Sequence, residues 1–238
     1  MRSLILALQF LTRLPTPPLK DFRAEEQAGC VVWFPLVGLL VGALVAAAMA
    51  LGAQIDPWLG ALLGLAVWVG VTGALHLDGL ADLADALGAA HRDRERLLAV
   101  LADPHLGVFG AVALFMQLLA KLVLLMLLAR AGAFWAVPLI AAWGRWGVLI
   151  WTRLPSIKPG LGERFGWRAA APVTLLWGAL LGLTSAALAP ALLIAPLAAT
   201  GWFIYLRRKL GGMTGDALGA GVEWNETLLL AALAFGMR

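Results

Sequence analysis

Long apolar runs alternate with polar segments along most of the chain. A helix needs about 20 mostly apolar residues to cross the hydrocarbon core of a bilayer. Six runs approach that length, near residues 30–53, 57–75, 106–130, 133–152, 171–188 and 190–206. The pattern predicts an all-α, polytopic integral membrane helical bundle of six transmembrane helices, with a seventh if the apolar tail after residue 226 also crosses.

A shorter apolar segment, residues 2–14, precedes these runs. It is too short to span a bilayer comfortably, and the prolines at 15, 17 and 18 cannot continue a helix. We therefore expect an N-terminal helix at the membrane interface. Residues 1–238 as a whole are expected to form a single integral membrane domain.

Composition agrees with a membrane protein. Hydrophobic residues make up 62% of the chain and charged residues 13%, whereas a soluble domain is about half apolar and about a quarter charged. Membrane lipids are expected partners and nucleic acid is not. A single cysteine, Cys30, excludes a disulfide framework and a cysteine-based metal cluster. The 11 tryptophans are expected to anchor the helices at the interface.

The charges between the runs predict an orientation. The short turns near 54–57, 131–132 and 188–190 carry almost no basic residues, with Arg130 as the exception, whereas the long connections are rich in Lys and Arg. The positive-inside rule places such connections, and the N-terminus, in the cytoplasm. We therefore expect the acidic stretch that follows the second run, and with it an active site there, to face the cytoplasm.

An acidic stretch opens the polar segment 76–105. Asp78, Asp82 and Asp85 stand at relative positions 0, 4 and 7, and therefore on one face of a helix. Like charges at this spacing destabilise a helix by about 0.2–0.5 kcal/mol per pair. A divalent cation would compensate, and Mg²⁺ prefers a few carboxylates together with substrate phosphates and water. The alternative is a solvated acidic face.

A second acidic element lies near the C-terminus. Asp216 and Glu223 are seven residues apart, again on one helical face, after the glycine-rich entry 211–215. Glycines let the backbone approach a phosphate closely, although they also serve close helix packing in membranes.

Two cations, Lys121 and Arg145, fall inside predicted spans. Intramembrane charges face either a partner or a cavity. They are either structural ion pairs with acidic residues or phosphate-binding groups, and Gln117 extends the polar face of Lys121. In the entry to the 106–130 run, Asp103 either caps the helix, with Pro104 in its first turn, or contacts substrate together with His105. His76 is a candidate substrate contact through an orienting hydrogen bond.

Carboxylates that hold a metal at the membrane–cytosol boundary suggest phosphoryl-type transfer. The metal would neutralise a pyrophosphate and stabilise the departure of a nucleoside monophosphate. The sequence contains neither a P-loop nor a glycine-rich kinase loop, which argues against ATP chemistry of those kinds.

Five segments together resemble one family. They are residues 10–17 (FLTRLPTP), 34–42 (FPLVGLLVG), 76–82 (HLDGLAD), 103–110 (DPHLGVFG) and 211–220 (GGMTGDALGA). Their order and spacing resemble the cobalamin synthase family, the adenosylcobinamide-GDP ribazoletransferases. The resemblance implies transfer of the adenosylcobinamide phosphate group from adenosylcobinamide-GDP to α-ribazole or α-ribazole 5′-phosphate. It also implies release of GMP, a requirement for Mg²⁺ and an integral inner-membrane enzyme.

The resemblance also implies roles for individual residues. Asp78, Asp82 and Asp216 become candidate metal ligands and catalytic groups, followed by Asp85 and Glu223 as ligands. The backbone at Gly79, Gly212, Thr214 and Gly215 would approach the pyrophosphate. Phosphate contacts are expected from Arg13, Lys121 and Arg145, and Glu25 would join the acidic cluster. The sequence departs from the family's basic-Asp-Ser-Arg-x-Gly pattern at Ala102, Pro104 and His105.

Two other functions are weighed against this one. A CDP-alcohol phosphotransferase uses a comparable acidic helix pair, but its longer signature, with Ala-Arg after the first Asp-Gly and four aspartates in register, is not met. A divalent-cation or small-solute transporter would place acidic groups near the bilayer midplane, often within inverted repeats. Further candidate partners are a second copy of the chain and other enzymes of cobalamin assembly.

Overall fold

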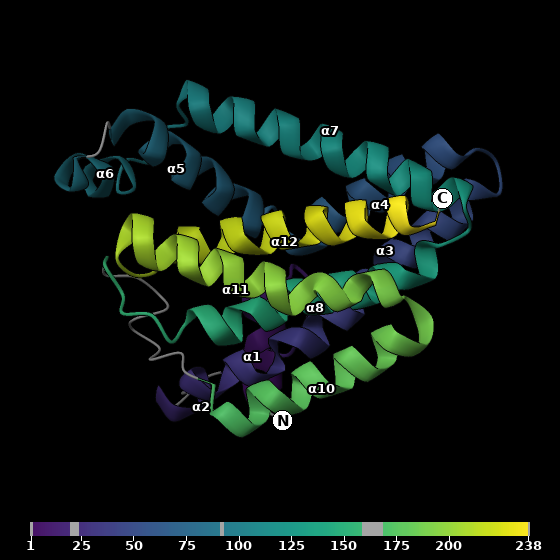
Figure 1. Ribbon diagram of the computed structural model, residues 1–238, viewed down its shortest axis with the longest axis horizontal. Helices are drawn as coiled ribbons and strands as arrows, with labels where there is room; N and C mark the ends of the chain where they lie inside the picture. The colour runs from purple at the N-terminus through teal and green to yellow at the C-terminus, as the bar shows by residue number, and fades with distance from the viewer. Residues whose placement is uncertain (1, 20–23, 91–92, 159–168, 238) are drawn as a thin grey trace.

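The chain folds into a bundle of α-helices (Figure 1). The computed structural model describes residues 2–19, 24–90, 93–158 and 169–237, with only the backbone at positions 24 and 25. Within those ranges the regular structure is helical, and one isolated bridge joins Ser156 to Met213. The predicted all-α class is confirmed.

Five helical segments are long and apolar enough to cross a membrane. They are Glu26–Ala53, which ends in α3 (Phe34–Ala53); α7 (Val108–Arg130); Phe134–Trp151, which contains α8 (Val137–Trp151); α10 (Ala171–Leu188); and Pro190–Leu210, which contains α11 (Ala195–Tyr205). These segments confirm a polytopic membrane bundle and match five of the six expected runs.

The remaining run is not one straight span. It divides into α4 (Pro57–Thr72) and α5 (Leu75–Ala90), whose axes differ by 85°. The break lies at Gly73 and Ala74, which have φ angles of 60° and 59°. A left-handed conformation ends a helix, and outside glycine it costs roughly 1–2 kcal/mol. The acidic stretch therefore belongs to a separate helix that turns away from α4.

Two segments that the hydropathy pattern places between the spans are helical over much of their length, as the spacing of their acidic residues predicts. Residues 76–105 contain most of α5 and also α6 (Arg94–Val100), and residues 207–226 contain the first half of α12 (Gly215–Gly236). Figure 1 shows α12 running through the middle of the bundle, where its side chains are largely buried. At about 1.5 Å per residue, its 22 residues are long enough to cross a bilayer. The hydropathy pattern divided this helix into a polar segment and an apolar tail that is short for a full span, so its whole length was not predicted.

The N-terminal segment forms α1 (Arg2–Leu11), followed by the short helix α2 (Ala24–Ala28). The expected N-terminal helix is confirmed and ends three residues earlier than the apolar pattern suggested. Ala7 and Leu11 are buried, and Arg2 forms an ion pair of 3.0 Å with Glu26.

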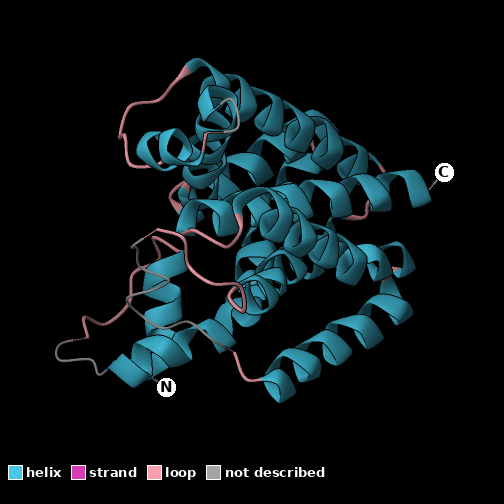
Figure 2. Cartoon of the chain, turned by 60° about the vertical axis from the view of Figure 1, so that its left-hand side comes forward, coloured by secondary structure: helices cyan, strands magenta, loops and turns pink. Residues whose placement is uncertain are grey.

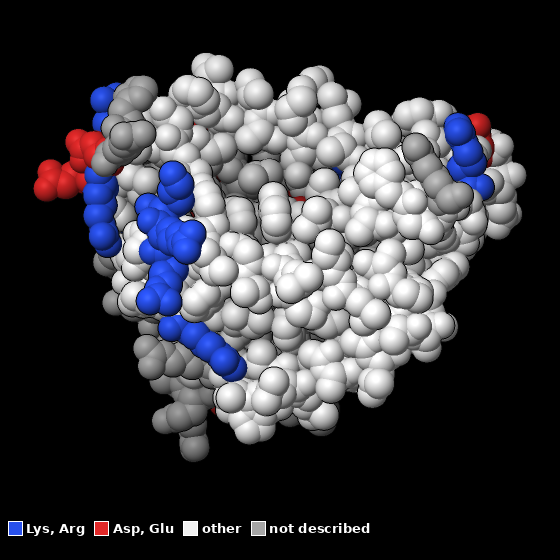
Figure 3. Space-filling model, viewed as in Figure 1, with Lys and Arg blue, Asp and Glu red and all other residues white. Residues whose placement is uncertain are grey.

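Charged side chains gather at the ends of the bundle. Figure 3 shows most of the Lys and Arg side chains of this face at one end, next to an uncharged middle. The long connections lie at that end, around α6 and the end of α11, and short turns join the helices at the other (Figures 1 and 2). An apolar middle with basic residues concentrated at one end is typical of a membrane protein.

The tryptophans correct one expectation. Trp143 and Trp151 are among the largest fully buried side chains, and they donate indole hydrogen bonds to Ser185 Oγ (3.0 Å) and to the carbonyl of Ala199 (2.9 Å). These two residues join helices inside the bundle instead of anchoring it at an interface, because the buried indole N–H finds a partner on a neighbouring helix.

Candidate active site

Helices α5 and α12 cross with almost no side chain between them. A Cβ atom at Gly79 would lie 2.7 Å from the backbone oxygen of Asp216, and one at Gly219 would lie 3.3 Å from the Cα of His76. Only glycine allows backbones to approach this closely. The crossing brings the two acidic elements of the sequence together.

Three carboxylates share this crossing. Asp78 is exposed, and Asp82 and Asp216 are partly buried. Asp82 is repelled by both Asp78 and Asp216. Burial raises the pKa of Asp216, the Lys158 ammonium opposes that rise, and the charge of Asp78 adds to it. We call Asp78, Asp82 and Asp216 the carboxylate cluster. Its mutual repulsion favours a bound cation.

Local structure fixes the position of Asp216. The Thr214 side chain accepts a hydrogen bond of 3.0 Å from the Ala217 backbone N–H and so caps the N-terminus of α12. Asp216 then lies in the first turn, where a negative charge is favourable. Thr214 is thus a capping residue whose own side chain is buried. Gly215 begins the helix and is exposed.

The structure adds a residue that the sequence pattern did not single out. Lys158 Nζ lies 3.5 Å from Asp216 Oδ2 and also donates to the backbone carbonyl of Leu101. Lys158 lies in one of the long connections that are rich in Lys and Arg, and nothing in the sequence distinguishes it from its basic neighbours. The contact puts one cation beside the carboxylate cluster.

The donor set fits Mg²⁺ held jointly with a substrate. Within the described part of the chain, no group of three or more His, Cys, Asp or Glu side chains is arranged to hold a metal ion by itself. Mg²⁺ is usually held by one or two carboxylates together with substrate phosphates and water. The one or two protein ligands of such a site would come from Asp78, Asp82 and Asp216.

Asp85 has a different environment from the other aspartates of α5. Its Oδ2 accepts a hydrogen bond from Gly107 N and its Oδ1 accepts one from Gly110 N, each of 2.8 Å. Asp85 therefore caps α7 from another helix. The sequence pattern suggested Asp103 for this cap, which is wrong, because Asp103 binds the backbone N–H and ring of His105 instead.

Asp85→Ala is expected to destabilise the protein by about 1–2 kcal/mol, because the first turn of α7 loses both acceptors. Thermal unfolding in detergent would measure this as a lower midpoint. Asp85→Asn, which keeps one acceptor oxygen, should recover part of the loss. If Asp85→Ala abolished metal binding without lowering the unfolding midpoint, Asp85 would be a metal ligand and not a cap.

Asp103 and His105 pair with each other on the surface. The His105 Nδ1 lies 2.6 Å from Asp103 Oδ1, with side chains that are 88% and 55% exposed respectively. The hydrogen bond from His105 lowers the pKa of Asp103. A substrate contact by either residue stays a prediction.

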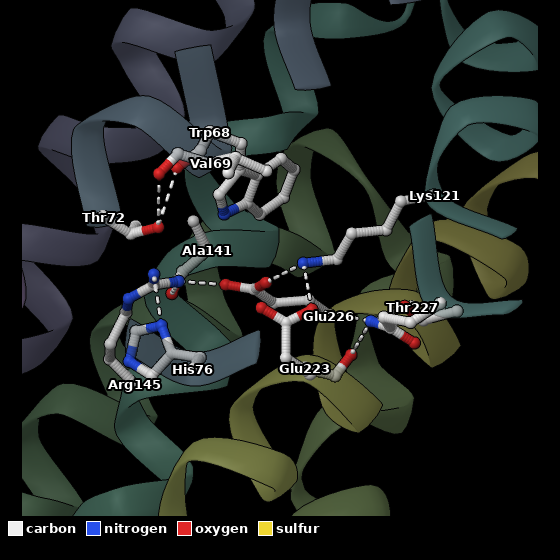
Figure 4. A network of polar contacts seen from close by, with 11 residues as sticks. Trp68, Val69, Thr72, His76, Lys121, Ala141, Arg145, Glu223, Glu226 and Thr227 are labelled. Atoms are coloured by element: carbon white, nitrogen blue, oxygen red, sulfur yellow. Dashed lines mark hydrogen bonds and ion pairs between the residues drawn. The ribbon is translucent and has the colours of Figure 1, made fainter. Parts of the chain in front are cut away.

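The buried cations form an ionic network inside the bundle (Figure 4). Lys121 Nζ lies 2.7 Å from Glu223 Oε2 and 2.6 Å from Glu226 Oε2, and Arg145 binds the other oxygen of Glu226. Lys121 is 2% exposed, and Arg145 and Glu226 are 0% exposed. The structural ion-pair interpretation of the two cations is therefore confirmed, and in this arrangement neither is open to a phosphate.

Three further findings come from this network. Glu223, expected as a metal ligand, is paired with Lys121 and also accepts a hydrogen bond of 2.7 Å from Gln117. Glu226 was not among the expected site residues, although it bridges both cations. His76 Nδ1 lies 3.5 Å from Arg145 Nη2, so it faces the buried network and not the open end of the bundle.

Three further expected residues lie outside helices α5 and α12. Arg13 packs against Gly73 at the break between α4 and α5, and its backbone N–H donates to the Val71 carbonyl (2.7 Å). Gly212 is buried against Pro155. Glu25 lies in α2, and its side chain is outside the described part of the structure.

Gly79→Ala is expected to reduce activity by about 100-fold, because its Cβ would force α5 away from Asp216 and a shift of about 1 Å can have that effect. The control is Gly70→Ala, since a Cβ at Gly70 meets nothing within 4 Å. Initial rates of both variants would be compared at equal amounts of folded protein. Equal activities would show that the close crossing is not needed for catalysis.

The fold and the carboxylate cluster together define a polytopic membrane protein with an acidic site at one end of its helical bundle. Comparison with known protein families then identifies the family to which the chain belongs. The family described as cobalamin-5-phosphate synthase matches residues 3–234. The chain belongs to this family, which confirms the resemblance seen in its motifs.

Individual relatives agree over their full lengths. A protein of Thiobacillus denitrificans is 54% identical over 241 residues, which cover 100% of this chain and 97% of the relative. One from Laribacter hongkongensis is 60% identical over 238 residues, which cover 98% of each chain. Both are named adenosylcobinamide-GDP ribazoletransferase. No solved structure shows significant similarity to the chain.

Proposed function

We propose that this chain transfers the adenosylcobinamide phosphate group from adenosylcobinamide-GDP to α-ribazole or its 5′-phosphate, with release of GMP. The main support for this proposal is that the two most specific family motifs meet at the α5–α12 crossing and supply its carboxylate cluster. These motifs are residues 76–82 and 211–220. Relatives that are 54% and 60% identical over nearly the whole chain bear the name of this reaction.

The proposed reaction needs no nucleophile from the protein. A free ribose hydroxyl, present in both α-ribazole and its 5′-phosphate, loses its proton to solvent, and its oxygen bonds to the phosphorus that bears the cobinamide. The bond from that phosphorus to the bridging oxygen of the pyrophosphate breaks, and GMP leaves with that oxygen. Asp78, Asp82 and Asp216 would hold Mg²⁺. When bound, Mg²⁺ offsets the charge of the pyrophosphate and of the departing phosphate.

We further propose that the carboxylate cluster faces the cytoplasm and that the membrane is the bacterial inner membrane. The concentration of Lys and Arg at the end of the bundle that holds the connections supports this orientation. The nucleotide-linked donor and a ribazole acceptor are water-soluble, so an opening at that side would admit both.

The test uses purified full-length protein in lipid nanodiscs with adenosylcobinamide-GDP, α-ribazole and Mg²⁺. Chromatography should show cobalamin and GMP in equal amounts, none in EDTA, and recovery when Mg²⁺ is restored. CDP-diacylglycerol, offered as the donor in parallel, should give no product. Folded protein that formed no cobalamin in the presence of Mg²⁺ would contradict the proposal.

A further inference from the structure

A cavity of about 410 Å³ opens at the basic end of the bundle. Its lining residues come from the end of α5, from α6 and the residue before it, from Ile157 and from the segment that follows α11. Apolar side chains and cations line it together: Leu87, Leu97, Ile157, Arg94, Arg208 and Lys209. A volume of this size is in the range of small-molecule sites.

The cations of this cavity have no acidic partner among the described residues. No ion pair within the described ranges involves Arg94, Arg208 or Lys209. The one carboxylate of the cavity wall, Asp93, accepts hydrogen bonds from Glu95 N (2.9 Å) and Arg96 N (3.3 Å) instead. The cavity therefore carries unneutralised positive charge and favours an anion.

The cavity and the carboxylate cluster share a wall. Met213 N donates to the Pro155 carbonyl (2.9 Å), and Ile157 N donates to the Met213 carbonyl (3.1 Å). Ile157 lines the cavity, and the next residue, Lys158, contacts Asp216. Leu87 of the cavity wall also lies on α5, about 7.5 Å further along the helix axis than Asp82 and on another face of that helix.

Gly211 keeps the cationic side of the cavity accessible. It has a φ of +75°, and a Cβ at this position would lie 3.4 Å from the Arg94 guanidinium. The residue both permits the left-handed turn after α11 and leaves space beside Arg94. The turn belongs to the same segment that supplies Asp216.

We propose that this cavity binds the nucleoside monophosphate end of the donor and holds that group when it leaves. Arg94, Arg208 and Lys209 bind the phosphate, and Leu87, Leu97 and Ile157 lie against the nucleoside. This inference rests on the proposed function, which requires a nucleotide phosphate beside the carboxylate cluster. An anionic lipid headgroup has the same phosphate chemistry, so the experiment includes an arm for it.

The test is equilibrium binding of GMP to the full-length protein in zwitterionic nanodiscs, measured by calorimetry. Arg94→Gln and Arg208→Gln are each expected to raise the Kd for GMP about tenfold, which corresponds to about 1.4 kcal/mol. The matched control is Arg207→Gln, an exposed neighbour of Arg208 that does not line the cavity. It should bind GMP with the wild-type Kd.

Several outcomes would overturn the inference. One is no GMP binding by the wild type, and another is an unchanged Kd for GMP in both cavity variants. A third is an equal loss of GMP affinity in Arg207→Gln, which would indicate non-specific electrostatic attraction instead of binding in the cavity. Competition of GMP by anionic nanodisc lipid, with no GMP binding in zwitterionic lipid, would assign the cavity to lipid headgroups.

Turnover of adenosylcobinamide-GDP is measured on the same samples. Turnover by the wild type with an unchanged Kd in the cavity variants leaves the proposed function intact and removes this site. The reverse result is weaker GMP binding in the variants with no turnover by the wild type. It would support the cavity as a nucleotide site and contradict the proposed reaction.

Discussion

Asp78→Asn is expected to lower the rate of cobalamin formation by about 1,000-fold while the protein stays folded. Asp78 is the exposed member of the carboxylate cluster, so its replacement removes a charge without disturbing buried packing. Loss of charge stabilisation at a metal site is worth several kcal/mol, and each 1.36 kcal/mol changes the rate tenfold. The rate would be measured with saturating donor and acceptor over a range of Mg²⁺ concentrations.

The control for Asp78→Asn is Glu95→Gln. Glu95 is an exposed carboxylate in the first turn of α6, outside the cluster. Its variant should keep the wild-type rate and Mg²⁺ dependence. A lower apparent affinity for Mg²⁺ in Asp78→Asn alone would support a ligand role. If Asp78→Asn kept its full rate, the proposed role of the carboxylate cluster would have to be abandoned.

Glu226→Leu is expected to destabilise the protein by about 3–5 kcal/mol, a larger loss than that expected for Asp85→Ala. Glu226 is fully buried and binds both Lys121 and Arg145. Without it, Arg145 has no acidic partner among the described residues, and Lys121 keeps only Glu223. The unfolding midpoint in detergent would report the change.

A double replacement separates charge from packing. Arg145→Met alone leaves Glu226 with one cation, and Glu226→Leu with Arg145→Met removes both partners of the same ion pair. The double variant is expected to be less destabilised than the sum of the two single variants, because the unpaired buried charge is gone. Strict additivity would show that the two side chains do not stabilise each other.

Apolar run length predicted most of the helices, and the two errors have different causes, one in the local backbone and one in contacts between helices. The 57–75 run is continuous in hydropathy, so nothing in it signals the two left-handed residues, Gly73 and Ala74, that turn α5 away. The buried position of helix α12 was not predicted because this segment contains charged residues. Its acidic residues suggest a solvated segment, but Glu223 and Glu226 are neutralised by cations from α7 and α8.

The same limit applies to the site. The spacing of Asp78, Asp82 and Asp85 predicts one helical face but cannot say what opposes each carboxylate. Asp85 meets backbone N–H groups of residues 22 and 25 positions further along the chain. Glu226 meets Lys121 and Arg145 from 105 and 81 positions away. Such partners are set by how the helices pack, which periodicity in one segment does not describe.

The central place of α12 has a consequence for how the protein is made. This helix follows the other described helices in the chain and is therefore synthesised after them, yet it lies in the middle of the bundle. Until it emerges from the ribosome, Lys121 and Arg145 reside in membrane-inserted segments without the glutamates that neutralise them, a costly state for a charge in lipid. The carboxylate cluster likewise lacks Asp216 until then. The insertion of α12 therefore completes the bundle and the site in the same step. A chain truncated before residue 215 would keep unpaired charges inside the membrane and would be a target for the degradation of misfolded membrane proteins.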